Sequence, residues 1–235
     1  AYYYDGVLEL NNYNSSSFSG LVLWDLERIN IRVVGSNVLS KIEERYTSIN
    51  TQKYTDIAFT GDGSLTVSSN NYYCVQTSGD VTVNSGNLTF GNNKGQMGLS
   101  AASLDVNDGE LVLKGKTSAI NSTCKVNTGF IFVDENGTIW DGSTDLSNYT
   151  YLYINNLDYI IVGGVAMKDG DYLANDATTT TITQPEGGYA YYKDGTLTLR
   201  DYNYKGIGYT YAPSDGYCAI LYSETDLTVT LKGEN

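Results

Sequence analysis

The chain has 235 residues, of which 41% are hydrophobic and 17% are charged, so it can bury a core and is not a disordered tail. Its net charge of −13 repels phosphates and anionic lipid, and no apolar run approaches the roughly 18 residues of a membrane span, so we expect neither nucleic-acid binding nor membrane insertion. The chain contains no His, which removes Ser-His and Cys-His nucleophile pairs.

The first segment of the sequence is repeated near the C-terminal end. The run "AYYYDGVLELNNY" at 1–13 returns as "AYYKDGTLTLRDY" at 190–202, with most positions identical, and 21–37 returns at 219–235. We therefore expect one nearly complete large repeat and the start of a second, within an intact polypeptide that is longer at one or both ends. The predicted domains are a first large repeat at 1–147, in which 38–56 ("SKIEERY" and its flanks) is an excursion loop with some helical character, connecting strands and a hairpin at 148–189, and a truncated second repeat at 190–235.

The middle of the chain repeats a shorter pattern built around glycine. The run "VNSGNLTF" at 83–90 returns as "VNDGELVL" at 106–113 and as "VNTGFIFV" at 126–133. The glycines of successive copies lie 23 residues apart, and the last follows after 20. Apolar residues two and four positions after each glycine predict a short strand with one buried face.

This short period predicts a solenoid, because it carries no helical periodicity. The leucine-rich consensus is missing, so we predict an all-β, right-handed parallel β-helix with coils of about 20–23 residues. Successive coils would hydrogen-bond about 4.8 Å apart. Asn84, Asn107 and Asn127 are expected to stack as an amide ladder at one corner, and the glycines to supply turn conformations that other residues resist.

The three cysteines are too few and too odd in number for a disulfide framework. Cys124 falls where other copies of the short repeat carry Val81 and Leu104, so we expect it to be a small core residue. Cys74 and Cys218 each follow a tyrosine, and the sequence leaves open whether they pair.

An acidic loop follows the short repeats. The run "DENGTIWDGSTD" at 134–145 gathers hard oxygen ligands around glycine, which is the chemistry that calcium takes in flexible loops. The spacing is not that of an EF-hand, and an ordinary acidic turn is the alternative. The candidate calcium ligands are Asp134, Asn136, Asp141 and Asp145, and no other cofactor is expected.

The connecting region contains "YIIVGGVAM", a hairpin signal of two apolar runs joined by two glycines. The run from "YIIVGGVAMKDGDYLAND" through "GGYAYYKDGTLTLRDYNY" to "AILYSETDLTVTLKGEN" resembles the repeated β-helical modules of bacterial secreted and cell-surface proteins, often labelled carbohydrate-binding. That resemblance covers most of the chain and is closest over 162–235. It implies an extracellular, cell-surface or cell-wall location and, by association, carbohydrate binding. It offers no fixed catalytic residue.

Aromatic residues supply the main functional clue. The chain has 22 Tyr and two Trp, and aromatic rings both stack on sugars and favour protein interfaces. The alternative is that tyrosine simply suits strands and half-buried faces. The candidate ligand-binding residues are Trp24, Tyr202, Tyr204, Tyr209, Tyr211 and Tyr222.

These observations predict a non-enzymatic, secreted or cell-surface β-helix module that acts in adhesion and binds a glycan or a surface protein through exposed aromatic rings. One alternative is a structural spacer or a repeat that self-associates through its coil ends, where strand edges are unpaired. A second alternative is a polysaccharide hydrolase or lyase, which needs two carboxylates about 5–10 Å apart in an open groove. Asp62, Asp80 and Asp108 are the candidates for that chemistry.

Overall fold

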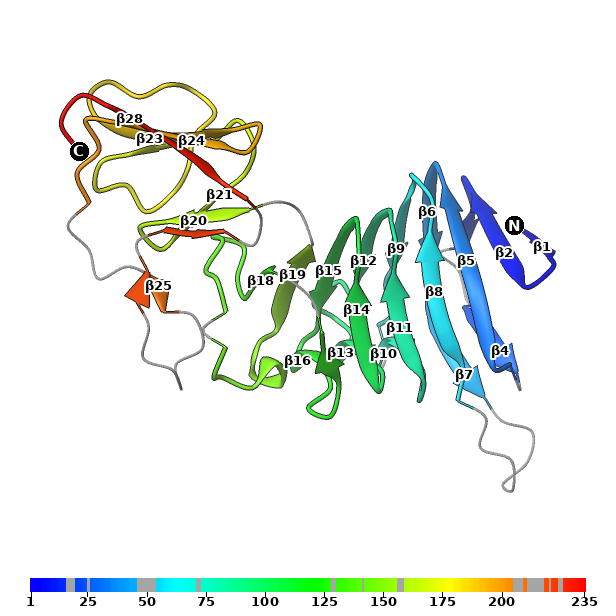
Figure 1. The fold of residues 1–235 in the computed structure, drawn as a ribbon. Coiled ribbons are helices and arrows are strands. Elements are labelled where there is room, and N and C mark those ends of the chain that lie inside the picture. Colours follow the sequence, from blue (N-terminus) through cyan, green and yellow to red (C-terminus); the bar gives the residue numbers. More distant parts are fainter. Residues whose placement is uncertain are drawn as a thin grey trace. The chain divides into compact units, whose positions relative to one another are not determined.

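The computed structural model describes residues 1–15, 20–24, 26–45, 54–70, 73–127, 130–140, 142–155, 159–204, 209–210, 218–219, 221–223 and 226–235. The fold is all-β, as predicted, and divides into two compact units (Figure 1). Unit 1 comprises 1–140 and 144–156, and unit 2 comprises 141–143 and 157–235. Most of the connecting region therefore folds with the second copy rather than forming a separate segment. Within the described ranges the one helical element is a 3-10 turn, η1 (Leu146–Asn148), and no helix there is long and apolar enough to cross a bilayer.

Unit 1 is built from three sheets. Sheet A contains β1 (Tyr2–Tyr4), β2 (Val7–Asn11), β5 (Arg28–Val34), β8 (Asp56–Thr60), β11 (Asp80–Val83), β14 (Ser103–Val106) and β17 (Lys125–Val126). Sheet B contains β3 (Asn14–Ser15), β6 (Ser36–Leu39), β9 (Ser64–Val67), β12 (Asn87–Phe90), β15 (Glu110–Lys114), β18 (Phe130–Phe132) and β19 (Tyr151–Asn155). Sheet C contains β4 (Leu21–Trp24), β7 (Ile42–Arg45), β10 (Tyr73–Gln76), β13 (Met97–Ser100) and β16 (Ser118–Ile120).

The chain visits these sheets in rotation. From β5 to β16, consecutive strands belong to sheets A, B and C in turn, and the neighbouring strands within each sheet pair in parallel. Figure 1 shows the resulting succession of side-by-side strands in unit 1. The glycine-centred repeat sets the register, because Leu88 lies opposite Leu65 on one side and Leu111 on the other. The short period thus corresponds to one passage through the three sheets, and we call one such passage a coil.

The core of unit 1 lies between the three sheets, and strand alternation fills it. Leu88 and Phe90 on β12 are fully buried, while Thr89 between them is partly exposed. The rings of Phe59 and Phe90 pack with centroids 5.4 Å apart. At the corners, Gly109 has φ +87° and its α-carbon approaches the backbone of the preceding coil so closely that an added Cβ would lie 2.4 Å from the Gly86 carbonyl oxygen. Gly109 is therefore needed for both turn conformation and close stacking.

The predicted excursion at 38–56 is wrong for the part that the structure describes. β6 and β7 both lie within the rotation of sheets, and residues 46–53 fall outside the described ranges. Ile42 is fully buried and pairs with Leu21 on one side and Val75 on the other. Pairing on two sides outweighs the helix propensity of the Glu-Glu-Arg run, because tertiary context overrides weak local preference.

The parallel stacking changes direction at the third copy of the glycine pattern. In sheet A, β17 continues parallel to β14, but in sheet B the reversed strand β19 lies between β15 and β18 and is antiparallel to both. The Tyr153 hydroxyl on β19 donates a hydrogen bond to Glu110 Oε1 of β15 over 2.9 Å. In a regular stack β18 would pair directly with β15, but in sheet B β19 separates the two strands.

Unit 2 contains three smaller sheets. They comprise β20 (Ile160–Val162), β21 (Val165–Met167) and β27 (Leu221–Ser223) in sheet D, β22 (Tyr172–Ala174), β23 (Tyr189–Lys193), β24 (Thr196–Arg200) and β28 (Thr228–Lys232) in sheet E, and β25 (Tyr209–Thr210) and β26 (Cys218–Ala219) in sheet F. The predicted hairpin is formed by β20 and β21. The connector strands β20, β21 and β22 pack with β23 and β24 around one core.

The second copy of the opening segment reproduces the fold of the first. β23 and β24 form an antiparallel hairpin, and β24 pairs in parallel with β28, just as β1, β2 and β5 do in unit 1. The hairpin register is conserved residue by residue, since Tyr3 lies opposite Leu8 and Tyr192 opposite Leu197.

The turns and polar contacts of the two copies also correspond. Asn12 and Asp201 occupy the same turn position, and each has φ +47°. The Tyr13 amide donates to Asn37 Oδ1 over 2.8 Å, and the Tyr202 amide donates to Asn235 Oδ1 over 2.9 Å. The large repeat is therefore a repeat of structure as well as of sequence.

Candidate functional site

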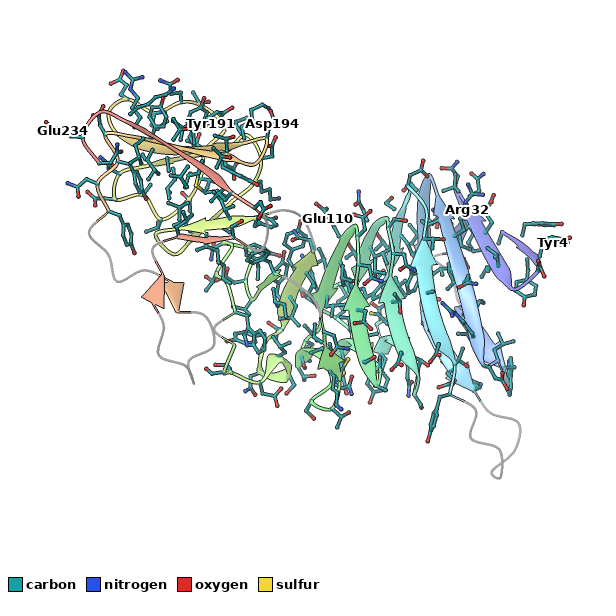
Figure 2. All side chains as sticks on the ribbon, in the orientation of Figure 1. Tyr4, Arg32, Glu110, Tyr191, Asp194 and Glu234 are labelled. Carbon is teal, nitrogen blue, oxygen red and sulfur yellow. The ribbon has the colours of Figure 1, made fainter. Side chains whose placement is uncertain are left out.

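Four exposed aromatic side chains of unit 1 lie on its first strands, while Tyr54, which is also exposed, lies shortly before β8. Tyr2, Tyr3 and Tyr4 on β1 are all more than half exposed, and the rings of Tyr2 and Tyr4 are 6.4 Å apart and nearly parallel. Figure 2 shows Tyr4 projecting away from the strands of this unit. Trp24, a predicted ligand-binding residue, ends β4 and is 50% exposed. β1 and β4 are the end strands of sheets A and C. This pair of edges is the candidate functional site, and we call it the first-coil edge.

The sequence analysis did not select the tyrosines of β1 as binding residues. The available signal was three consecutive tyrosines directly before an Asp-Gly turn. Asp5 and Gly6 both have positive φ, 50° and 77°, which closes a tight hairpin and leaves β1 on the outside of the sheet. Alternation alone could not show that the outer side of β1 has no neighbouring strand in its sheet.

Of the predicted aromatic residues in unit 2, Tyr202 does not offer its ring to a ligand. It is only 7% exposed and belongs to the unit 2 core, and burial raises the pKa of its hydroxyl to about 12. Tyr204 is half-buried and packs against the same core. Tyr209 and Tyr222 lie in β25 and β27, but their side chains, like Tyr211, fall outside what the structure describes. The structure therefore does not bring the predicted residues together with Trp24 into one described site.

The predicted calcium loop is held by its own hydrogen bonds. Asp134 accepts from the Asn136 and Thr138 amides with one oxygen and from the Thr138 hydroxyl with the other, at 2.9, 2.9 and 2.6 Å. These bonds, led by the Thr138 hydroxyl, lower the pKa of Asp134. Asp145 instead caps η1 by accepting from the Ser147 amide.

A full calcium ligand set does not emerge from the part of the chain that is described. No group of three or more His, Cys, Asp or Glu side chains suited to a metal occurs in those ranges, and Asp141 lies outside them. Asn136 is exposed in the loop. The calcium site stays a prediction.

The candidate catalytic aspartates are exposed. Asp62 and Asp108 precede the corner glycines of coils two steps apart, a separation of about 10 Å given the spacing of paired strands. Asp108 accepts from the Gly109 amide, and Asp80, in sheet A, accepts from the Ser103 hydroxyl. None is placed in the water-excluding surroundings that a glycosidase gives its general acid.

Two cysteines are free thiols within the described ranges. Cys74 is completely buried in unit 1, and burial raises its pKa. Cys124 is half-buried and packs against the same core, but its predicted correspondence with Val81 and Leu104 is wrong, because Leu104 pairs with Val126. Burial, assisted by the charges of Asp80 and Asp105, raises the pKa of Cys124 to about 12. Neither has the electropositive setting of a reactive cysteine.

The predicted asparagine corner is present between two coils. Asn107 Nδ2 donates to Asn84 Oδ1 over 2.9 Å, and both side chains face solvent. The prediction is wrong for Asn127: Val126 pairs with Leu104 and the Asn127 backbone N–H donates to the Leu104 carbonyl, so Asn127 lies two residues away from the position of Asn107 in this register. The ladder therefore serves the stacking of coils.

Comparison with protein-family models, with curated proteins and with solved structures finds no match for this chain.

Proposed function

We propose that unit 1 is a right-handed parallel β-helix and that the chain is a non-enzymatic, secreted or cell-surface module of a repeat array, which extends by adding coils and serves as an adhesive spacer. The rotation of successive strands through three parallel sheets supports the β-helix. Right-handed crossovers are strongly preferred wherever parallel strands are connected within a sheet, which supports the hand. The exposure of the candidate aspartates, which lack water-excluding surroundings, favours a role without catalysis.

The observation that carries the proposal is that a strand buried in the first copy of the repeated segment has an exposed counterpart in the second copy. Val33 on β5 is fully buried in the core of unit 1. Its counterpart Leu231 on β28 is 65% exposed. β28 ends sheet E, whereas β5 continues to β8. An apolar strand placed at a sheet edge is suited to receive a further strand.

The test adds, after the second copy of the repeated segment, the residues that follow its first copy. Because Asn235 takes the place of Asn37, residues 38–156 are appended directly after Asn235. We expect the added copy of β8 to pair with β28 and to slow exchange of the β28 amides by at least about a hundredfold, since pairing moves them from a frayed edge into a cooperative core. Hydrogen exchange followed by mass spectrometry measures this.

A matched control carries Phe59→Asp in the appended copy only, which places a charge where the original Phe59 is fully buried. The control should leave β28 exchanging as fast as in the 235-residue chain. The proposal of a coil-adding module is wrong if β28 stays unprotected in the extended chain while unit 1 remains folded.

A second candidate function is glycan binding at the first-coil edge, which is favoured by the exposure of Trp24 and of the β1 tyrosines. A glycan array probed with calcium and again with chelator tests it, together with Trp24→Ala. Binding that is lost with Trp24→Ala supports an aromatic glycan site, and loss with chelator supports the calcium loop. If the folded protein binds no glycan, glycan binding is contradicted and the spacer function stays as the proposal.

A further inference from the structure

The first-coil edge of unit 1 has a counterpart in unit 2 that is not free. β23, the copy of β1, has a strand on each side, because β22 pairs with it antiparallel on the side away from β24. β27, which aligns with β4, pairs with β20. Both covering strands come from the connector, residues 159–189. One continuous segment therefore covers both edges of the second copy.

The backbone contacts made by the two residues directly before β22 show which backbone groups the edge of β1 presents. Tyr192 donates its amide to the Asp171 carbonyl over 3.1 Å and accepts from the Gly170 amide over 2.8 Å. Tyr3 matches Tyr192, and the two hairpins share their register. The Tyr3 amide and carbonyl therefore point toward the outer side of sheet A, as those of Tyr192 point toward β22.

The side chains of β22 explain the aromatic residues on this edge. Tyr172 stacks on Tyr191 with ring centroids 4.2 Å apart and planes inclined by 21°. Tyr191 matches Tyr2. Coverage by the connector also accounts for burial, since Tyr192 is 3% exposed and its counterpart Tyr3 is 57% exposed. The exposed rings on β1 thus have the identities that pack against a β22-like strand in unit 2.

The edge of β4 gives the same answer independently. In unit 2, Ile161 of β20 lies opposite Tyr222. Tyr222 aligns with Trp24, the other large exposed aromatic residue of the first-coil edge. Ile160 and Val162 are fully buried in the unit 2 core beside Leu221. An apolar strand like β20 therefore suits the edge that Trp24 ends.

We infer that the first-coil edge of unit 1 is an acceptor for the connector of another copy of this repeat, with a β22-like strand adding antiparallel to β1 and a β20-like strand adding to β4. This rests on the proposed repeat array and deepens it by assigning the partner segment. The recognition is strand addition, in which backbone bonds supply affinity and alternate side chains supply specificity. The exposed aromatic rings are then an intermodule contact, and a glycan would compete for them.

One difference between the copies adjusts the strength of this contact. Lys193 lies 3.7 Å from the Asp169 carboxylate of the connector, and Asp169 also accepts from the Asp194 amide. Asp194 matches Asp5, so the amide contact is retained at β1. Lys193 matches Tyr4, so the ion pair with Asp169 has no counterpart at Tyr4. Tyr4→Lys should therefore strengthen connector binding by about two- to fivefold, the range expected for an exposed pair.

The experiment places residues 159–189 directly ahead of Ala1 in the full 235-residue chain, because Ala1 matches Ala190. Tethering removes the cost of bringing two molecules together. We expect the Tyr3 amide to exchange at least about tenfold more slowly than in the untethered chain, with Trp24 fluorescence shifted to shorter wavelength by burial. A control tether carries Leu173→Pro, which removes a strand amide and should abolish both changes.

The outcomes separate this inference from the proposed array. Protection of Tyr3 with a Trp24 shift, strengthened by Tyr4→Lys and lost with the Leu173→Pro tether, supports the acceptor edge. Unchanged Tyr3 exchange with β5 still protected overturns it, even if the extension after Asn235 succeeds. Equal protection by both tethers also overturns it, because the effect would not depend on strand pairing.

Discussion

Replacing Gly109 with Ala tests whether the corners of unit 1 are set by contact between coils. Gly109 has φ +87°, which costs an alanine about 1–2 kcal/mol. The new Cβ would lie 2.4 Å from the Gly86 carbonyl oxygen and 2.9 Å from its nitrogen. Relief to ordinary contact at 3.4 Å requires a shift of about 1 Å between two backbones, since 3.4 − 2.4 = 1.0.

That shift would disrupt the link between the coils. The Glu110 amide donates to the Gly86 carbonyl over 2.9 Å, and a separation near 3.9 Å is no longer a hydrogen bond. Losing it costs about 1 kcal/mol beyond the backbone strain. We therefore expect Gly109→Ala to destabilise the protein by about 2–3 kcal/mol.

Urea unfolding followed by circular dichroism measures this, with Gly6→Ala as the matched control. Gly6 has a similar φ of +77°, but an added Cβ there meets no atom within 4 Å. The control should lose only the strain of about 1–2 kcal/mol. Equal losses at Gly6 and Gly109 would refute the argument, because conformation alone would then account for both.

Three further predictions concern other described groups. A double-mutant cycle with Asn84→Ala and Asn107→Ala should give a coupling of about 0.5–1 kcal/mol in urea unfolding, and additive losses would show that the exposed amide bond does not link the coils. Burial raises the pKa of Tyr202 from 10.0 to about 12, so on raising the pH the unfolded state loses this proton before the folded state does. The free energy of unfolding should therefore be unaffected by this group below pH 10 and should fall by about 3 kcal/mol between pH 10 and 12. Tyr202→Phe should reduce that fall, as measured by thermal melts across this pH range. Native Cys74 and Cys124 should react with a thiol reagent much more slowly than the unfolded chain, and rapid labelling of Cys74, located by mass spectrometry, would contradict its burial.

The parts of the fold that could be predicted are those that repeat. Alternation after each corner glycine identifies Leu88 and Phe90 as inward-facing, because a strand places every second side chain on one face. The reversal of β19 could not be predicted, since alternation reads the same in both chain directions. The strand at Ile42 was hidden by a local helix-like run that pairing overrides.

The candidate site was harder to predict, because exposure depends on which strands lie alongside. Tyr3 and Tyr192 share their local sequence, yet one is exposed and the other is buried. The difference arises from the connector, which lies next to Tyr192 through pairings that are distant in the sequence. No local pattern around Tyr202 distinguishes a ligand-facing ring from a core ring for the same reason.

The reversed strand β19 has a consequence for how such a protein can change over generations. Each coil between Gly86 and Gly109 adds 23 residues without altering the strands at either end, so an in-frame deletion or duplication of this length changes the number of coils alone. β19 pairs with β15 antiparallel. Removing residues 87–109 would place β15 beside β9, whose Leu65 and Val67 share the register of Leu88 and Phe90 on β12. Removing residues 87–109 should therefore shorten the stack by one strand spacing, about 4.8 Å, and leave β19 paired between β15 and β18. The length of unit 1 can therefore change in whole repeats of 23 residues, while the antiparallel pairing of β19 with β15 is kept.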